Sequence, residues 1–150
     1  ATASSKEWTQ GNVKGAGVDS YFDEFIYGDM VEEAKPDPAI FLLAAKRLGV
    51  EPGECMVLED SFNGIRAAAA GGFYPVMVPD LTLPTPEIKA LLAAECESLL
   101  EVIGLFKNGT FELYGKKAAF RVRKNRGGYL ERSSSRDHWG RLILPGTFSV

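Results

Sequence analysis

The chain has 150 residues and a formal net charge of −3, with 45% hydrophobic and 25% charged residues, as in a soluble globular domain with a substantial core. No stretch of about 18 apolar residues occurs, which excludes a transmembrane helix, and the first residues lack the apolar run of a signal peptide. The charge is uneven: residues 1–106 carry seven Lys or Arg and 17 Asp or Glu, whereas residues 107–150 carry ten and three. This shift predicts a domain of residues 1–106 followed by a basic C-terminal extension.

The first third of the chain predicts two short strands and two helices. Residues 1–3 are expected to end a strand, and Ser4, three positions before Glu7, has the spacing of a helix capping box. Residues 24–27 predict a second strand. In the sequence Lys35-Pro-Asp-Pro38, Asp37 is the expected N-cap and Pro38 the first residue of a helix that runs to Gly49.

The next segment predicts a buried strand over residues 55–58, because a continuous apolar run is typical of a parallel strand covered on both faces. A helix over residues 62–70, a strand over residues 74–78 and helices over residues 87–94 and 98–106 follow. Strands that alternate with helices predict an α/β fold: a Rossmann-like parallel sheet with flanking helices.

The cysteines and the single histidine are not expected to be catalytic or metal-binding residues. Cys55 and Cys96 are expected to be small buried apolar side chains, and two thiols without an export signal indicate a reducing compartment, hence the cytoplasm. His138 has no Cys or His partner at ligand spacing, which argues against a zinc site.

Polar residues gather where the predicted strands end, which is where parallel sheets bind ligands. The adjacent acids Glu59 and Asp60 could hold Mg²⁺, or Asp60 could cap the next helix while Glu59 faces water; local sequence does not separate these readings. Thr2 and Ser4 could bind phosphate or form a plain helix cap, and Lys35 taken alone could be an ordinary surface lysine.

The order and spacing of these groups resemble the later motifs of the haloacid dehalogenase superfamily, in its β-phosphoglucomutase-like phosphatase branch. The resemblance spans residues 1–106, and its motifs read Ala1-Thr2-Ala3-Ser4-Ser5, Lys35-Pro-Asp-Pro38 and Val57-Leu-Glu-Asp-Ser-Phe-Asn-Gly-Ile-Arg-Ala-Ala68. It implies a Mg²⁺-dependent phosphatase or phosphomutase that acts on a sugar phosphate or a similar small phosphorylated metabolite.

The resemblance also implies a role for each site residue. Thr2 and Lys35 are the implied catalytic residues: Thr2, with Ala3 and Ser4, would bind the phosphoryl group, and Lys35 would neutralise its charge. The implied metal ligands are Asp60 and Glu59, which Ser61 and Asn63 would help to orient.

The nucleophile of this family lies in an Asp-x-Asp motif on an earlier, central strand, and these 150 residues contain no such motif. The substrate-selecting cap domain is not found either. We therefore expect a partial core with a gap beside the strand that carries Glu59 and Asp60, inactive by itself and completed by a missing N-terminal segment that carries the nucleophile.

Two alternatives to a catalytic role stay open. The chain could be a non-catalytic half-domain or interaction module that another polypeptide completes. The basic extension, residues 107–150, is expected to be a short hairpin of residues 111–114 and 118–122 or a disordered arm. A nucleic-acid contact by this extension is the less favoured reading, and it would use Arg121, Arg123, Lys124 and Arg126 with Phe120 and Tyr129.

Overall fold

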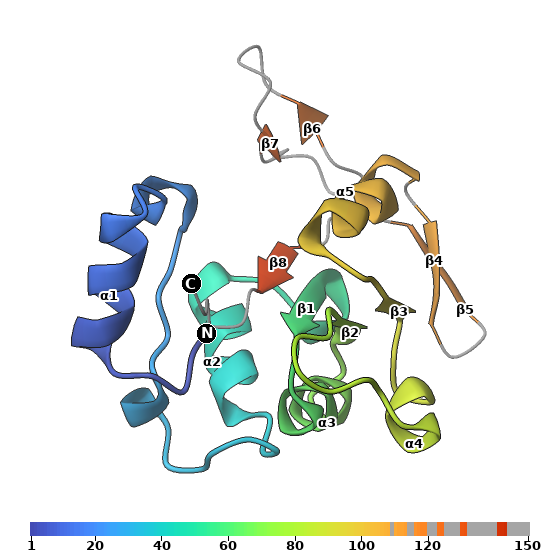
Figure 1. The fold of residues 1–150 in the computed structure, drawn as a ribbon, viewed down its shortest axis with the longest axis horizontal. Helices are drawn as coiled ribbons and strands as arrows, with labels where there is room; N and C mark the ends of the chain where they lie inside the picture. Colours follow the sequence, from blue (N-terminus) through green and yellow to red (C-terminus); the bar gives the residue numbers. More distant parts are fainter. Residues whose placement is uncertain (109, 114–115, 120–122, 125–129, 132–140, 144–150) are drawn as a thin grey trace.

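The computed structural model describes residues 1–108 and the strand residues 110–113, 116–119, 123–124, 130–131 and 141–143. Its centre is a four-stranded sheet in the order β3-β2-β1-β8, in which all neighbouring strands are parallel (Figure 1). The bounds of these strands are Cys55–Glu59 for β1, Tyr74–Met77 for β2, Ala94–Glu95 for β3 and Arg141–Ile143 for β8. The predicted parallel α/β fold with flanking helices is confirmed.

Helices flank this sheet, and the other described strands of the C-terminal extension lie outside it. The α-helices are α1 (Lys6–Gly15), α2 (Ala39–Leu48), α3 (Phe62–Ala70), α4 (Pro86–Lys89) and α5 (Leu99–Asn108). Single 3-10 turns are η1 (Asp19–Tyr21), η2 (Gly28–Met30) and η3 (Pro52–Glu54). Outside the main sheet, β4 (Thr110–Leu113) pairs with β5 (Lys116–Ala119), and β6 (Arg123–Lys124) pairs with β7 (Leu130–Glu131), both antiparallel.

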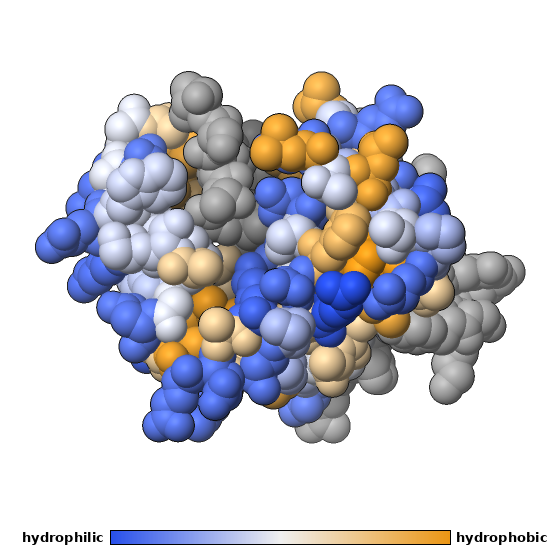
Figure 2. Space-filling model, turned by 60° about the horizontal axis from the view of Figure 1, so that its bottom comes forward, coloured by the Kyte–Doolittle hydropathy of each residue, from blue (hydrophilic) through white to orange (hydrophobic). Residues whose placement is uncertain are grey.

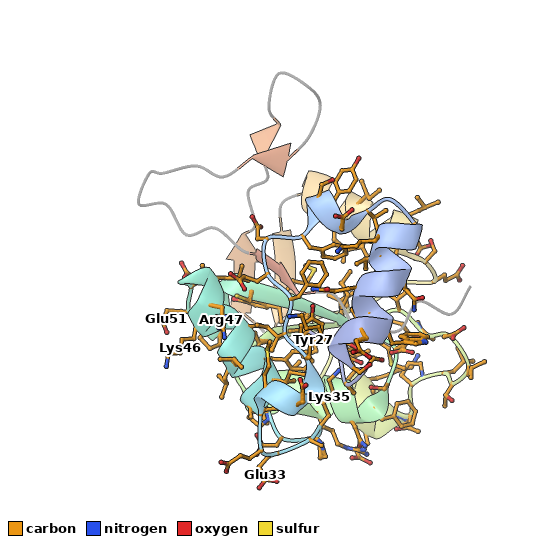
Figure 3. The ribbon with its side chains drawn as sticks, turned by 90° about the vertical axis from the view of Figure 1, so that its left-hand side faces the viewer. Tyr27, Glu33, Lys35, Lys46, Arg47 and Glu51 are labelled. Atoms are coloured by element: carbon orange, nitrogen blue, oxygen red, sulfur yellow. The ribbon has the colours of Figure 1, made fainter. Side chains whose placement is uncertain are left out.

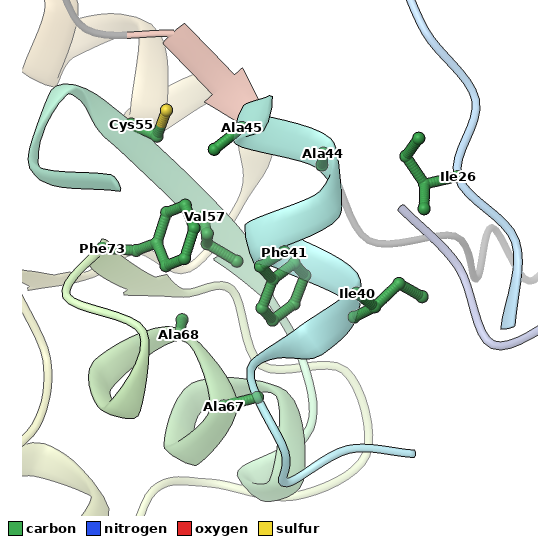
Figure 4. Packing of buried hydrophobic residues seen from close by; sticks show 10 residues of the cluster. All are labelled: Ile26, Ile40, Phe41, Ala44, Ala45, Cys55, Val57, Ala67, Ala68 and Phe73. Atoms are coloured by element: carbon green, nitrogen blue, oxygen red, sulfur yellow. The ribbon is translucent and has the colours of Figure 1, made fainter. Parts of the chain in front are cut away.

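Strand β1 is buried along its whole length, as its apolar run predicts. Its side chains alternate between two cores, since successive residues of a strand point to opposite faces. Cys55 and Val57 pack with α2 and α3, where Phe41 and Phe73 meet edge to face (Figure 4). Met56 and Leu58 pack on the other face in a second cluster of buried residues, with Val76, Cys96 and Val102. Both cysteines are free and buried, which confirms their prediction.

The helices that flank β1 begin and end close to their predicted positions. Helix α2 starts at Ala39, one residue later than expected, and the Asp37 side chain still supports this end, since its Oδ1 accepts a hydrogen bond from the Ala39 amide at 2.8 Å. It ends at Gly49, whose φ of 67° lies in the left-handed region that glycine adopts without strain. Helix α3 covers the predicted residues, but its N-cap is Ser61 and not Asp60.

Three local predictions are wrong. The N-cap of α1 is Ser5 and not Ser4, because the helix begins at Lys6 and the Ser5 side chain accepts a hydrogen bond from the Trp8 amide. The two strands predicted at residues 1–3 and 24–27 reduce to one isolated parallel bridge between Thr2 and Tyr27. The helix predicted over residues 87–94 is only the single turn of α4, because the following residues pair with β2 as strand β3.

The C-terminal extension contains the predicted hairpin and three strands that were not predicted, β6, β7 and β8. The hairpin is β4–β5, although Tyr114 and residues 120–122 of the predicted range lie outside the described residues. Strand β8 pairs with Cys55–Val57 of β1, on the side opposite β2. The gap expected at this edge is therefore filled over three residues of β1, and the prediction of a bare edge is wrong there.

The described surface mixes polar and apolar residues, and in the view of Figure 2 apolar residues gather mainly on the right-hand side. Among the described residues the large apolar side chains that are exposed are Trp8, Tyr21, Met30, Leu42, Leu81, Leu83, Leu99, Leu100 and Ile103. In the described part of the chain, no helix has the length and apolar character needed to cross a bilayer.

Candidate functional site

The centre of the candidate site is an ion pair between Lys35 and Glu59. Glu59 is the last residue of β1, and its side chain is 1% exposed. The Nζ atom of Lys35 contacts Glu59 Oε1, and the Lys35 side chain is 16% exposed. In Figure 3 Lys35 lies within the fold on the loop that leads to α2, whereas Lys46 and Arg47 lie at the edge of the molecule. The reading of Lys35 as an ordinary surface lysine is therefore wrong.

The other oxygen of the Glu59 carboxylate is also bound. The hydroxyl of Ser61 donates a hydrogen bond to Glu59 Oε2 at 2.8 Å and accepts one from the Gly64 amide at 3.1 Å. Glu59 is thus tied to the N-terminus of α3 as well as to Lys35. The sequence reading in which Glu59 faces water and Asp60 caps α3 is wrong, because Ser61 is the cap and Glu59 is buried.

An aromatic ring also contacts the Lys35 ammonium. The Nζ atom lies 4.8 Å from the ring centroid of Phe41, a distance at which the negative face of the ring attracts a cation. Phe41 is fully buried in the core between α2 and β1. The ammonium is therefore held by a carboxylate and an aromatic face, which restricts where its remaining donor hydrogens point.

Asp60 has a different environment from Glu59, although the two residues are adjacent. It follows the last residue of β1, is partly exposed, and forms no hydrogen bond or ion pair with any residue that the structure describes. This partial exposure lets a ligand from solution reach its side chain. Of the two residues expected to orient the acids, Ser61 contacts Glu59, whereas Asn63 is exposed.

Thr2 is buried and held by backbone bonds. Its amide donates to the Ile26 carbonyl at 2.9 Å, and its Oγ1 accepts from the Ser4 amide at 3.0 Å. Ala3 is exposed, and its carbonyl approaches Gly28 so closely that a Cβ atom at Gly28 would lie 3.0 Å from the oxygen. A small residue at position 28 therefore lets the chain of residues 1–4 run beside residues 26–28.

The start of the chain lies beside the Lys35–Glu59 pair. Burial, together with the Lys35 ammonium, lowers the pKa of the Ala1 α-amino group to about 5, and the Glu59 carboxylate opposes this shift. Thr2 follows directly, so the expected phosphate-binding residues begin next to the expected lysine and acids. Sequence reasoning gave neither Phe41 nor Gly64 a role at the ion pair: Gly64 entered only as part of the motif that ends at Ala68, and Phe41 only as an apolar residue of its helix.

The donor set for a metal ion is small. Within residues 1–108 and the described strands, no group of three or more His, Cys, Asp or Glu side chains is arranged to hold a metal. Mg²⁺ is commonly bound by one or two carboxylates, with phosphate oxygens and water as the remaining ligands. The residues present fit such a partial site: the Asp60 side chain is partly exposed, and both carboxylate oxygens of the preceding Glu59 are already bound.

Comparison with known proteins agrees with this geometry. A family model of haloacid dehalogenase-like hydrolases matches residues 1–72, a range that contains Thr2, Lys35 and both acids. Residues 1–72 are therefore similar to the haloacid dehalogenase-like hydrolases. The matched range contains every residue of the candidate site.

Two named relatives to which the chain is similar are phosphatases. It is 46% identical over 55 residues to the phosphorylated carbohydrates phosphatase of Thermotoga maritima, covering 37% of this chain and 26% of the relative. It is 47% identical over 62 residues to the fructose-1-phosphate phosphatase YqaB of Escherichia coli, covering 41% and 33%. The chain therefore spans about a third or less of the length of these curated relatives.

Solved structures extend the likeness beyond the family match. The structure of CbbY from Rhodobacter sphaeroides in complex with phosphate superposes with a TM-score of 0.61 and 32% identity, over 68% of this chain and 46% of that one. This superposition shows that the chain shares about half of the CbbY fold.

Proposed function

We propose that residues 1–106 form the phosphate- and magnesium-binding part of a phosphatase or phosphomutase for sugar phosphates or similar small metabolites. The observation that carries this proposal is the buried Lys35–Glu59 pair at the carboxyl end of β1, with the available carboxylate of Asp60 beside it. The names of two relatives support the substrate class, because both are phosphatases of phosphorylated carbohydrates.

In this proposal Lys35 and Thr2 bind the transferring phosphoryl group. Phosphoryl transfer depends mainly on positioning and on neutralising the charge of the phosphoryl oxygens. The Lys35 ammonium is held in place by Glu59 and Phe41, so little rearrangement is needed when a phosphate arrives. The Thr2 hydroxyl and the backbone of Ala3 and Ser4 supply further polar groups at the start of the chain.

Asp60 is the proposed oxygen ligand of Mg²⁺. Bound there, the ion would supply positive charge close to the phosphoryl oxygens. Glu59 is proposed to support the metal site without binding the ion directly, because Lys35 and Ser61 already bind its two oxygens. Supporting residues of this kind orient the direct ligand and commonly affect metal affinity.

We further propose that the 150-residue chain does not hydrolyse phosphate esters by itself. It contains no Asp-x-Asp motif, and β8, the strand that lies beside β1, contains only Arg141, Leu142 and Ile143. The chemistry then needs a segment that brings the nucleophilic carboxylate. A small phosphorylated metabolite and such a segment are the proposed partners.

A second candidate is a half-domain that another polypeptide completes without catalysis. It is favoured by one observation: β8 pairs with Cys55–Val57 only, so no described strand pairs with Leu58 and Glu59 on that side of β1. An incoming strand could pair with this end of β1. The nucleic-acid reading stays a prediction, because Phe120, Arg121, Arg126 and Tyr129 lie outside the described residues; the cytoplasmic location and the boundary near Lys107 stay predictions too.

The deciding experiment measures binding and turnover separately. Mg²⁺ and inorganic phosphate are titrated into the isotope-labelled chain and followed by NMR, with Asp60→Asn as the test variant and the exposed acid Asp37→Asn as the matched control. Turnover of p-nitrophenyl phosphate is then measured for the chain alone and mixed with a polypeptide that carries an Asp-x-Asp strand.

Four outcomes are distinct. Binding lost only in Asp60→Asn, with turnover only in the mixture, supports the enzymatic proposal. Binding without turnover in the mixture favours the second candidate. Turnover by the chain alone that Asp60→Ala abolishes would contradict the proposed inactivity. The absence of both Mg²⁺ and phosphate binding in a folded chain would overturn the site itself.

A further inference from the structure

Helix α3 contains a glycine, Gly64, near its N-terminus, although glycine is the poorest helix former apart from proline. Gly64 is buried, and its backbone has no positive φ that would call for glycine. Its presence must therefore be explained by what surrounds it.

The space beside Gly64 is occupied by the carboxyl group of Glu59. A Cβ atom built on Gly64 would overlap the Glu59 Cδ and both carboxylate oxygens. Four residues lie between the two positions in sequence, and the turn from β1 into α3 brings them into contact. The end of the Glu59 side chain thus lies where any other residue at position 64 would place its first side-chain atom.

Gly64 also contributes through its amide. Its N–H donates to Ser61 Oγ at 3.1 Å, and the same Oγ donates to Glu59 Oε2 at 2.8 Å. The Ser61 hydroxyl has one hydrogen, so accepting from Gly64 leaves that hydrogen for Glu59. The glycine therefore both leaves room for the carboxylate and helps to orient the hydroxyl that binds it.

We infer that Gly64 is a positioning residue: its missing side chain allows the Glu59 carboxylate to reach Lys35 and so places the Lys35 ammonium in the phosphate site. That Gly64 affects phosphate and Mg²⁺ binding rests on the proposed function. That Gly64 lets Glu59 contact Lys35 does not depend on it. A side chain at position 64 would push Glu59 away from Lys35 and leave a half-buried ammonium without its carboxylate.

The experiment uses the whole chain and four proteins: wild type, Gly64→Ala, Glu59→Ala and the double variant. Gly11→Ala is the matched control, because Gly11 is also inside a helix and no atom lies within 4 Å of its built Cβ. The first readout is the rate at which acetic anhydride labels Lys35, with the exposed Lys14 and Lys46 as internal references. An ion-paired and partly buried ammonium reacts slowly, so labelling reports on the Lys35–Glu59 contact and not on stability.

Gly64→Ala is expected to raise Lys35 labelling toward the rates of Lys14 and Lys46, while Gly11→Ala leaves it unchanged. In the Glu59→Ala background no carboxylate remains to be displaced, so adding Gly64→Ala should not raise the rate of Lys35 labelling further. Unchanged Lys35 labelling in folded Gly64→Ala would overturn the inference, as would an equal increase with and without Glu59. If Gly64→Ala does not fold, recovery of folding in the double variant supports the inference and failure to recover overturns it.

The second readout is Mg²⁺ affinity. If the proposed function is correct, Gly64→Ala weakens Mg²⁺ binding about 10- to 100-fold, the usual effect of losing a residue that supports a metal ligand. Wild type that binds no Mg²⁺ would contradict the proposed function, and the labelling cycle would still decide the role of Gly64. The two failures are therefore distinguishable.

Discussion

The Lys35 ammonium pairs with the Glu59 carboxylate across 24 positions of sequence, joining the loop before α2 to the end of β1. This contact brings a cation of one motif to an acid of another. It also places a charged pair against the apolar core, since Phe41 lies beneath the ammonium. The first prediction concerns what this burial means for stability.

Removing one partner of the pair should be more destabilising than removing both. Lys35→Met or Glu59→Gln is expected to lower the free energy of unfolding by about 3–5 kcal/mol, because an uncompensated buried charge or polar group remains. The double variant Lys35→Met, Glu59→Met should recover part of this loss. Urea denaturation measures all three, and single variants that unfold like wild type would show that the pair is not maintained in solution.

The Ser61 hydroxyl should contribute more than an ordinary helix cap. Ser61→Ala loses the cap of α3, worth about 1 kcal/mol, and also the bond to the buried Glu59 carboxylate, worth about 1.5–3 kcal/mol. Ser5→Ala is the matched control, since the Ser5 side chain caps α1 at an exposed site. Thermal and urea unfolding should show the larger loss for Ser61→Ala, and equal losses would mean that the Glu59 contact adds no stability.

The stability of the 150-residue chain should fall as the pH is lowered from 8 to 5. The Ala1 amine has its pKa lowered from 8.0 to about 5 in the folded chain, so between these values the unfolded chain binds a proton that the folded chain does not. Protonation then favours unfolding, and this contribution levels off below pH 5. NMR titration of a labelled Ala1 methyl measures the folded pKa directly; a midpoint near 8 would contradict the buried amine.

Removing the C-terminal extension should expose one side of β1. A chain that ends at Asn108 lacks β8, so the amides of β1 that point away from β2 lose their partner strand. Within Cys55–Val57, the amides that bond to β8 are expected to exchange faster in the shortened chain. The amides of β1 that bond to β2 keep their protection. Equal exchange in the full and shortened chains would show that β8 does not pair with β1 in solution.

Much of the fold and the residue types of the site follow from the sequence alone. The continuous apolar run of β1 can be buried only between two layers, and Gly49 ends α2 where a left-handed residue is needed. Glu59 and Asp60 were found because polar groups after a buried parallel strand gather at one edge of the sheet, whereas Lys35 was found through the resemblance of its motif to the haloacid dehalogenase superfamily. Local chemistry and periodicity are sufficient for such inferences, since they depend on residues close in sequence.

Only the tertiary structure decided which of these residues is buried and bound and which is partly exposed. Glu59 is buried and fully bound while Asp60 stays available, because the turn into α3 points one carboxylate at Lys35 and Ser61 and leaves the other partly exposed. The need for Gly64 and the pairing of β8 with β1 could not be predicted, since each depends on atoms brought together by the packing of distant segments. Contacts of this kind have no local signature, because the free energy that selects them arises only when the whole sheet and its helices are assembled.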